Sequence, residues 1–291
     1  MGKDLCAQFP TAKRVFAETD DALGYSLSEL CFSGPESELK LTENTQPAIL
    51  ATSVAALRVL ETETSLRPAF VAGHSLGEYS ALVAVGALRF GDAVKIVRER
   101  GRLMQQAVSA GEGAMAVIIG LEMDEVGSLC VDASQGEVVS PANFNGAGQV
   151  VIAGTKSAVG RAMTLAKERG ARRVLDLSVS APFHCQLMQP AAEGLQKILS
   201  AIDVQPFSVG VITNVNADVN LNIDRVKGLL SEQAVQPVRW EESVKKLAEL
   251  GCTRALEVGP GKVLTGLIKR IAPTIATDNF EVPQDLARVA A

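Results

Sequence analysis

A basic excess, paired cysteines and a long apolar segment are all missing from this sequence, and each absence excludes a class of protein. The 291 residues carry a net charge of −5, so no face-wide positive charge is available to replace the counterions of nucleic-acid phosphates. No apolar run reaches the roughly 18 residues of a transmembrane helix, and no charged segment followed by an apolar one opens the chain. We therefore expect a soluble, cytoplasmic protein that binds neither nucleic acid nor membranes.

The five cysteines are odd in number, widely spaced and never arranged as Cys-x-x-Cys. This pattern is typical of a reducing compartment and predicts neither a disulfide framework nor a zinc site. Cys185 follows a histidine and is a candidate reactive thiol, although a small buried residue is the simpler interpretation. We expect no metal and no permanently bound cofactor.

Length and hydropathy patterns predict an α/β protein that contains an insertion. The chain exceeds the usual domain size of about 100–150 residues, and 47% of it is hydrophobic, enough for a substantial core. Residues 111–180 predict strands and helices in β-α-β-β-α-β order, which is that of a ferredoxin-like unit. Residues 1–110 and 181–291 then form a second, larger subdomain with alternating strands and helices.

Individual elements are predicted from apolar periodicity and from Gly and Pro breaks. In the larger part we expect helices up to residue 66, a strand and helix over 68–85, and then elements at 91–107, 188–201, 209–212, 241–249, 255–258 and 262–271. In the insertion we expect elements at 114–119, 123–133, 149–153, 156–169 and 173–177, and the start of a further strand at 138–140. The last ten residues are expected to form a loose tail.

The sequence Gly-His-Ser-Leu-Gly over residues 73–77 lies between an apolar run, 68–72, and a helix-like segment, 78–83. A bare Gly-x-Ser-x-Gly arises by chance on the order of 0.1 times in a chain of this length, so the surrounding pattern carries the argument. A strand, a sharp turn and a helix form a nucleophile elbow, which holds a serine hydroxyl clear at the end of a sheet. We expect Ser75 to be a nucleophile.

A serine hydroxyl needs a base, and histidine is the usual one at neutral pH. The chain has only two histidines, His74 and His184. The side chain of His74, next to Ser75, is expected to point away from the serine hydroxyl. His184 lies in a Pro-broken loop after a predicted strand, where a catalytic side chain can be presented. We expect His184 to be the base; the alternative is a hydrogen-bonded structural histidine.

One arginine shares the apolar face of the predicted helix 91–107. Ala93, Val97, Arg100 and Met104 recur at spacings of four, three and four residues, so Arg100 faces the core. A buried cation requires an anion. Arg100 could bind a substrate carboxylate through its two-pronged guanidinium, or it could form an internal salt bridge with Asp or Glu.

These segments together resemble the malonyl-CoA:acyl-carrier-protein transacylases of bacterial fatty-acid synthesis. The resemblance runs from about residue 3 to about residue 270 and rests on motifs at 73–81, 100–101, 143–145, 148–154, 183–185 and 257–261. The family combines an α/β-hydrolase-like large subdomain, with a parallel sheet and a nucleophile elbow, with an inserted ferredoxin-like small subdomain. The resemblance therefore implies the same division of this chain.

The resemblance implies a ping-pong acyltransferase that supplies malonyl groups for chain elongation in lipid metabolism. Ser75, deprotonated by His184, takes malonyl from malonyl-CoA, and the phosphopantetheine thiol of acyl carrier protein then accepts it. By position, the backbone carbonyl of Gln233 orients His184, and the backbone N–H of Leu76 is an oxyanion donor. The protein is expected to be a monomer.

Further positions match the family's substrate pocket. Arg100 matches the arginine that binds the malonyl carboxylate. Gln46, Asn143 and Asn145 match residues of the pocket and of the thioester arm. Phe183 resembles the malonyl-selective form of the loop before the histidine, whereas relatives that use branched substrates tend to have a smaller residue there.

Basic residues cluster at one end of the predicted insertion, although the chain as a whole is acidic. They are Lys167, Arg169, Arg172 and Arg173. Because the carrier proteins of this pathway are acidic, we expect Arg172 and Arg173 to contribute to docking of acyl carrier protein. The alternative is an ordinary solvated helix end.

The chain departs from the family at its start. Members begin with a short strand and a Gly-Gln-Gly-Ser-Gln-type loop, whose glutamine N–H is the second oxyanion donor, whereas this chain begins Met1-Gly2-Lys3. Loss of one oxyanion donor costs about 10²–10³ in rate. We expect either that the natural start lies upstream or that the protein is an impaired relative.

Two other functions stay open. A serine hydrolase or thioesterase would share the elbow, but such enzymes usually place the histidine near the C-terminus, and more than a third of this chain follows His184. An inactive relative that only binds carrier protein would follow from the absent segment.

Overall fold

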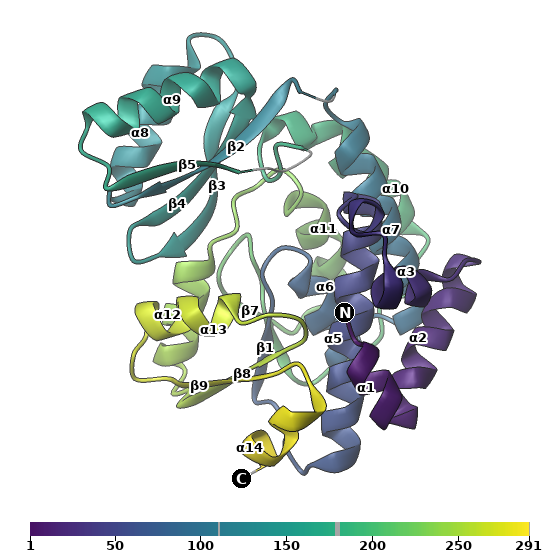
Figure 1. Ribbon diagram of the computed structural model, residues 1–291. Coiled ribbons are helices and arrows are strands. Elements are labelled where there is room, and N and C mark those ends of the chain that lie inside the picture. Colours follow the sequence, from purple (N-terminus) through teal and green to yellow (C-terminus); the bar gives the residue numbers. More distant parts are fainter. Residues whose placement is uncertain (110, 178–180, 291) are drawn as a thin grey trace.

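The computed structural model describes residues 1–109, 111–177 and 181–290, and it has a mixed α/β fold (Figure 1). Helices make up the first part of the chain, as expected: α1 (Lys3–Gln8), α2 (Pro10–Leu23), α3 (Leu27–Ser33), α4 (Glu36–Leu39) and α5 (Thr42–Glu63). Of the helices that the structure describes, none has both the length and the hydropathy to cross a bilayer.

Helix α5 forms the centre of the larger part, where it packs against α2 and α7 (Phe90–Gln106). Small residues on α5, such as Ala48, Ala51 and Ala55, are fully buried and allow close packing. Gly101 of α7 lies against the start of α5, because a Cβ there would be only 2.6 Å from the carbonyl oxygen of Thr42. This close approach brings the inner face of α7 beside α5, which is the arrangement that positions Arg100.

The strands of the larger part form two sheets within the described residues. β1 (Phe70–Ala72) pairs parallel with β6 (Gly210–Ile212), and β7 (Val219–Asn220) adds an antiparallel edge. A second parallel pair consists of β8 (Arg254–Val258) and β9 (Ala276–Phe280). The expected parallel pairing is present, although not as one continuous parallel sheet.

Six further helices complete the larger part: α6 (Gly77–Ala84), α10 (Gln189–Ser200), α11 (Ile223–Glu232), α12 (Trp240–Glu249), α13 (Val263–Ile271) and α14 (Leu286–Ala290). The short 3₁₀ turns η1 (Gln186–Met188) and η2 (Pro283–Asp285) precede α10 and α14. The expectation of a loose tail is wrong. η2 and α14 cover residues 283–290, where Val289 is fully buried against the main core.

The insertion has the predicted element order. Its elements are β2 (Gly113–Ile119), α8 (Met123–Ser134), β3 (Val139–Gly146), β4 (Gln149–Thr155), α9 (Lys156–Glu168) and β5 (Arg173–Leu177). The strands are antiparallel in the order β3-β4-β2-β5, and α8 and α9 cover the outer face of this sheet (Figure 1). The predicted boundaries at 110/111 and 180/181 fall on Ala110 and on residues 178–180, outside the described residues, so the division remains a prediction.

A short backbone connection joins the small sheet to the larger part. The N–H of Phe144 donates to the carbonyl oxygen of Val238 at 2.9 Å, and the N–H of Val238 donates to that of Ala142, also at 2.9 Å. The segment before Val238 contains Gln233. The small sheet therefore helps to fix the position of this part of the site.

Candidate active site

Ser75 lies in a sharp turn between β1 and α6. Its φ of 51° is in the left-handed region, which few residues other than glycine adopt. The turn needs a glycine at position 73, because a Cβ there would lie 2.0 Å from the carbonyl carbon of Gly77. A Cβ at Gly77 would meet nothing within 4 Å, so only the first of the two motif glycines is required for close approach. The local sequence thus forms the predicted elbow.

Ser75 and His184 form the predicted pair. Ser75 Oγ lies 2.7 Å from His184 Nε2, and His184 Nδ1 lies 2.7 Å from the backbone carbonyl oxygen of Gln233. Because a carbonyl oxygen only accepts, Nδ1 carries the proton, and the lone pair of Nε2 faces the serine hydroxyl. Burial, assisted by the positive charge of Arg100, lowers the pKa of His184 to about 3. The imidazole is therefore neutral at physiological pH and ready to accept a proton.

His74 points away from the nucleophile, as expected. Its Nε2 lies 3.0 Å from Asn145 Oδ1, and its ring packs against Trp240 with a centroid separation of 5.7 Å. Burial lowers the pKa of His74. His74 and Asn145 thus connect the elbow to strand β3.

Arg100 reaches the serine from the inner face of α7. It is 2% exposed, and its guanidinium donates to three neutral acceptors: Gln46 Oε1 at 2.7 Å, Ser75 Oγ at 3.0 Å and Gln233 Oε1 at 3.0 Å. None of the ion pairs among the described residues includes Arg100, and its buried Nε has no hydrogen-bond partner there. Burial lowers the pKa of Arg100. The cation therefore has unfilled capacity for an anion beside the nucleophile.

The other predicted pocket residues have different surroundings. Gln46 is buried on α5, and its side-chain oxygen accepts a hydrogen bond from Arg100. Asn143 is buried in β3 and bridges Val238 through its backbone. Phe183 is half-buried directly before His184. Asn145 is engaged with His74 rather than with the Ser75–His184 pair.

The backbone N–H of Leu76 is free to bind an oxyanion. Leu76 caps α6, and the neighbouring N–H groups of Gly77, Glu78 and Tyr79 donate back to carbonyls of the turn. No hydrogen bond within the described part of the chain uses the N–H of Leu76. A helix N-terminus also favours developing negative charge.

Two residues of the site were not predicted from the sequence. Glu78, 2% exposed, accepts hydrogen bonds through Oε2 from Gln233 Nε2 at 2.7 Å and from the Asn214 N–H at 3.1 Å. Asn214 Oδ1 accepts from the Ser75 N–H at 2.6 Å, and its Nδ2 donates to the carbonyl oxygen of Gly73 at 2.7 Å. Only their positions in the sequence could have indicated them: Glu78 lies in the first turn after the elbow, and Asn214 closely follows β6.

Cys185, the candidate reactive thiol, is buried. Cys185 is 1% exposed, its Sγ contacts the carbonyl oxygen of Pro182 at 3.1 Å, and burial raises the pKa of the thiol to about 11. It is therefore unreactive.

Of the basic cluster, Arg172 and Arg173 are exposed, whereas Arg169 pairs with Asp132.

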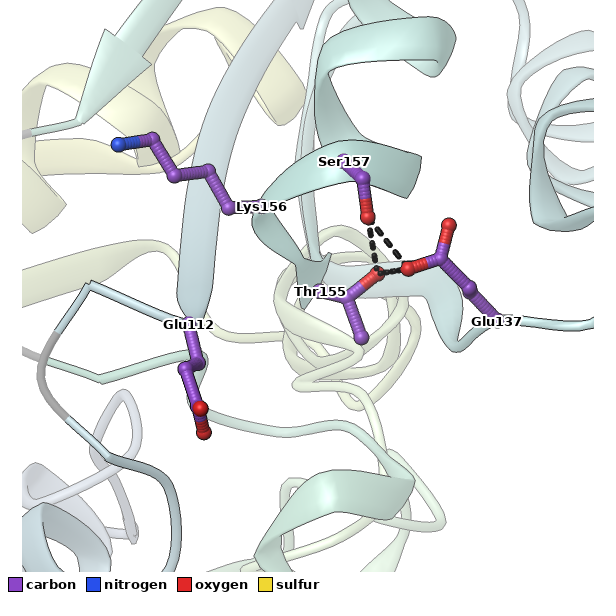
Figure 2. A pocket seen from close by; sticks show the side chains of 5 residues that line it. All are labelled: Glu112, Glu137, Thr155, Lys156 and Ser157. Atoms are coloured by element: carbon purple, nitrogen blue, oxygen red, sulfur yellow. Dashed lines mark hydrogen bonds between the residues drawn. The ribbon is translucent and has the colours of Figure 1, made fainter.

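A hollow of about 580 Å³ lies away from Ser75, between the start of β2 and the N-terminus of α9. Figure 2 shows that Glu137, Thr155 and Ser157 point toward one another there, while Glu112 and Lys156 lie apart. The hollow contains none of the predicted site residues. The described residues also include no cluster of three or more His, Cys, Asp or Glu that could hold a metal ion.

Comparison with known proteins gives consistent matches. A profile of the acyl transferase domain matches residues 1–278. The chain is 49% identical over 287 residues to the malonyl CoA-acyl carrier protein transacylase of Bacillus subtilis, covering 98% of this chain and 90% of that protein. A crystal structure of an acyl carrier protein S-malonyltransferase from Vibrio cholerae superposes with a TM-score of 0.97 at 49% identity, covering 99% of this chain and 94% of the other.

A third relative was solved together with its partner. It is a malonyl-transacylase in complex with a type II PKS acyl-carrier protein, with a TM-score of 0.96, 46% identity, and coverage of 99% of this chain and 93% of that one. The expectation that this chain lacks a family segment finds no support in these comparisons, because the matches cover nearly all of both proteins.

Proposed function

Because this chain belongs to the acyl transferase family, and within it to the malonyl CoA-acyl carrier protein transacylases, we propose that Ser75, His184 and Arg100 carry its malonyl transfer. One observation supports the proposal most directly: the Ser75 hydroxyl lies within hydrogen-bond distance of both the His184 base and the Arg100 guanidinium. A nucleophile, its base and a receptor for a carboxylate thus meet at one oxygen.

In the first half-reaction Ser75 Oγ attacks the thioester carbonyl of malonyl-CoA. His184 Nε2 takes the hydroxyl proton, and the carbonyl of Gln233 stabilises the resulting imidazolium through Nδ1–H. The N–H of Leu76 donates to the oxyanion. Collapse of the tetrahedral intermediate breaks the C–S bond, and the leaving coenzyme A thiolate takes the proton from His184. Malonyl-Ser75 remains.

The second half-reaction reverses these proton transfers. His184 Nε2 takes the proton of the phosphopantetheine thiol, and the thiolate attacks the ester carbonyl of malonyl-Ser75. Collapse breaks the C–O bond, and His184 returns the proton to Ser75 Oγ. The product is malonyl-acyl carrier protein, and the enzyme is regenerated.

Arg100 gives the reaction its preference for an acidic acyl group. The malonyl carboxylate replaces Ser75 Oγ as an acceptor of the guanidinium and uses its planar donor pair. This exchange also frees the serine hydroxyl for attack. Gln46 and Gln233 keep the guanidinium in place with their side-chain oxygens.

The finer organisation follows from the same family. We infer that the larger part is α/β-hydrolase-like and that the insertion is ferredoxin-like, since its strand order is β3-β4-β2-β5. The exposed Arg172 and Arg173 are proposed to bind the carrier protein, as a relative with a bound carrier protein makes reasonable. Asn143, Asn145 and Phe183 are proposed to line the path of the acyl group and its thioester arm. A cytoplasmic monomer remains a prediction.

The test is capture of the acyl-enzyme. Incubation with malonyl-CoA followed by denaturation should leave one malonyl group on Ser75, and mass spectrometry of peptides should locate it there. Ser75→Ala should carry none. A malonyl group on Cys185, or on no residue at all, would overturn the assignment.

A further inference from the structure

Glu78 is a buried acid that takes no part in the proton transfers of the proposed reaction. It lies in the first turn of α6, three residues after Ser75, and is 2% exposed. Buried carboxyl groups are costly unless they make hydrogen bonds, so a role for each contact is to be expected. Its two contacts lead to the nucleophile by one route and to the base by another.

The first route runs through Gln233. Glu78 Oε2 accepts from Gln233 Nε2 at 2.7 Å, and the same amide nitrogen donates to the Ser75 carbonyl oxygen at 3.0 Å. The backbone carbonyl of Gln233 is the acceptor that orients His184. Glu78 therefore fixes the residue that sets the tautomer and the direction of the base.

The second route runs through Asn214. Glu78 Oε2 also accepts from the Asn214 backbone N–H at 3.1 Å. The Asn214 side chain holds the elbow on both sides of the nucleophile, by accepting from the Ser75 N–H and donating to the Gly73 carbonyl oxygen. One carboxylate oxygen thus connects the supports of Ser75 and of His184.

We propose that Glu78 is a positioning residue that aligns Ser75 Oγ with His184 Nε2 through Gln233 and Asn214. This inference rests on the proposed function. The contacts use the acceptor capacity of Oε2, which a neutral carboxyl or an amide oxygen also has. The role therefore depends on the acceptor and not on the negative charge.

The electrostatic surroundings agree with this distinction. Burial raises the pKa of Glu78 to about 7, while its hydrogen bonds and the charge of Arg100 on α7 act in the opposite direction. The other titratable groups of the site are Tyr79 on the same helix, His184 and His74. Neutral and charged Glu78 both occur near neutral pH, and both forms keep the acceptor.

The experiment compares two substitutions at this position with one control. Glu78→Met keeps the length of the side chain and removes the acceptor, so the rate of Ser75 acylation should fall about 10- to 100-fold, as small misplacements of reacting groups do. Glu78→Gln restores an oxygen acceptor and should keep the rate within about threefold of the original. Leu82→Ala, one turn further along α6 and equally buried, should destabilise the fold but leave the acylation rate unchanged.

Acylation is measured with both malonyl-CoA and acetyl-CoA on folded protein. The Glu78→Met loss should be equal for the two substrates and should lie in the rate rather than in the KM. An unchanged rate in Glu78→Met, or a loss in Glu78→Gln as large as in Glu78→Met, would overturn the proposal.

A spectroscopic measurement reports on alignment directly. The chain has two histidines, so protein with ¹⁵N-labelled histidine gives ring signals from only two imidazoles. Glu78→Met should shift the His184 Nδ1–H resonance, or make its proton exchange faster, and leave His74 unchanged; Leu82→Ala should change neither. Unaltered His184 signals in Glu78→Met would contradict the proposal. If the unsubstituted protein formed no malonyl-Ser75, the proposed function would fail instead, and the two failures are distinct.

Discussion

Arginine is used in two opposite environments in this protein. Arg100 is 2% exposed and surrounded by amide, hydroxyl and aromatic groups, whereas Arg172 and Arg173 are exposed at the start of β5. A buried cation has lost its hydration and interacts strongly with one anion at a fixed place. An exposed cation interacts weakly and over a longer range, and salt screens it.

The difference agrees with the two roles proposed for these arginines, binding of the malonyl group and docking of the carrier protein. A malonyl group is small and carries its charge at a fixed distance from the reacting carbonyl, so one buried guanidinium can select it. A carrier protein is large and must dock and leave in each cycle, which exposed charges favour through faster association. We therefore expect the two regions to differ in the size, the substrate dependence and the salt dependence of their mutational effects.

The largest effect is expected at the base within the buried region. His184→Ala should slow acylation of Ser75 by about 10²–10⁴-fold, the usual range for a lost general base. Rapid quenching and mass measurement give the rate. Arg173→Glu, in the exposed region, should leave this half-reaction unchanged, and a comparable loss there would remove the contrast between the two regions.

The next largest effect is expected at Arg100, and it should differ between malonyl and acetyl transfer. Arg100→Ala should reduce malonyl transfer by roughly 10²–10³-fold and retain acetyl transfer, because only the charged acyl group needs the guanidinium. Arg100→Lys should restore little of the malonyl transfer rate, since an ammonium lacks the planar pair of N–H donors of a guanidinium. Transfer rates with malonyl-CoA and acetyl-CoA are compared.

Arg102→Ala on the same helix is the matched control, because Arg102 is partly exposed and pairs with Glu99. Equal losses of malonyl and acetyl transfer in Arg100→Ala would mean that Arg100 serves the fold and not the substrate.

A smaller effect concerns the dependence of stability on pH. The pKa of Glu78 is raised to about 7 in the folded protein, above its ordinary value, so the folded state binds more protons than the unfolded state between those values. Glu78 therefore lowers the free energy of unfolding as the pH rises from about 4.5 to 7. Glu78→Gln removes this decline, and its stability relative to the original protein should increase over that range by about 1–3 kcal/mol.

Urea unfolding at several pH values measures the effect, with the exposed Glu232→Gln as the control. His184 acts with the opposite sign in both proteins: its pKa is lowered to about 3, so it raises stability as the pH increases toward its ordinary value of about 6.5. A stability difference between Glu78→Gln and the original protein that did not change with pH would contradict the assigned titration.

The smallest effect belongs to the exposed region. Reversing the charge at both Arg172 and Arg173 should raise the KM for acyl carrier protein about three- to tenfold at low salt and by less at high salt. The rate of acylation by malonyl-CoA should stay the same. If both half-reactions slowed together, these arginines would belong to the fold or to the coenzyme A site.

Sequence patterns predicted most elements because each has a strong local signal. The apolar runs and breaks of the insertion predicted β2, β4 and β5 to within two residues, but only the start of β3, which continues to Gly146. The stripe through Arg100 predicted its inward direction. Ser75 and His184 could be paired from the sequence because only two histidines are available and one of them adjoins the serine.

Other features have no local signal. Glu78 and Asn214 are far apart in the sequence and meet only because β1 and β6 pair in parallel, which neither strand's sequence specifies. Helix α11 and strand β9 were missed, and η2 and α14 lie where a loose tail was expected. The burial of Val289 depends on the core that it joins, and its own few neighbours in the sequence do not reveal it.

The backbone of the two residues proposed to carry the proton transfer has a thermodynamic consequence. Ser75 and His184 both have left-handed φ angles, of 51° and 58°, although neither is glycine. Each such residue costs about 1–2 kcal/mol, a noticeable share of the roughly 5–15 kcal/mol that stabilises a folded protein. The surrounding hydrogen bonds hold these conformations in place, so loosening of the site relaxes both residues toward ordinary angles. We therefore expect partial damage to the fold to reduce activity before it reduces helix and strand content.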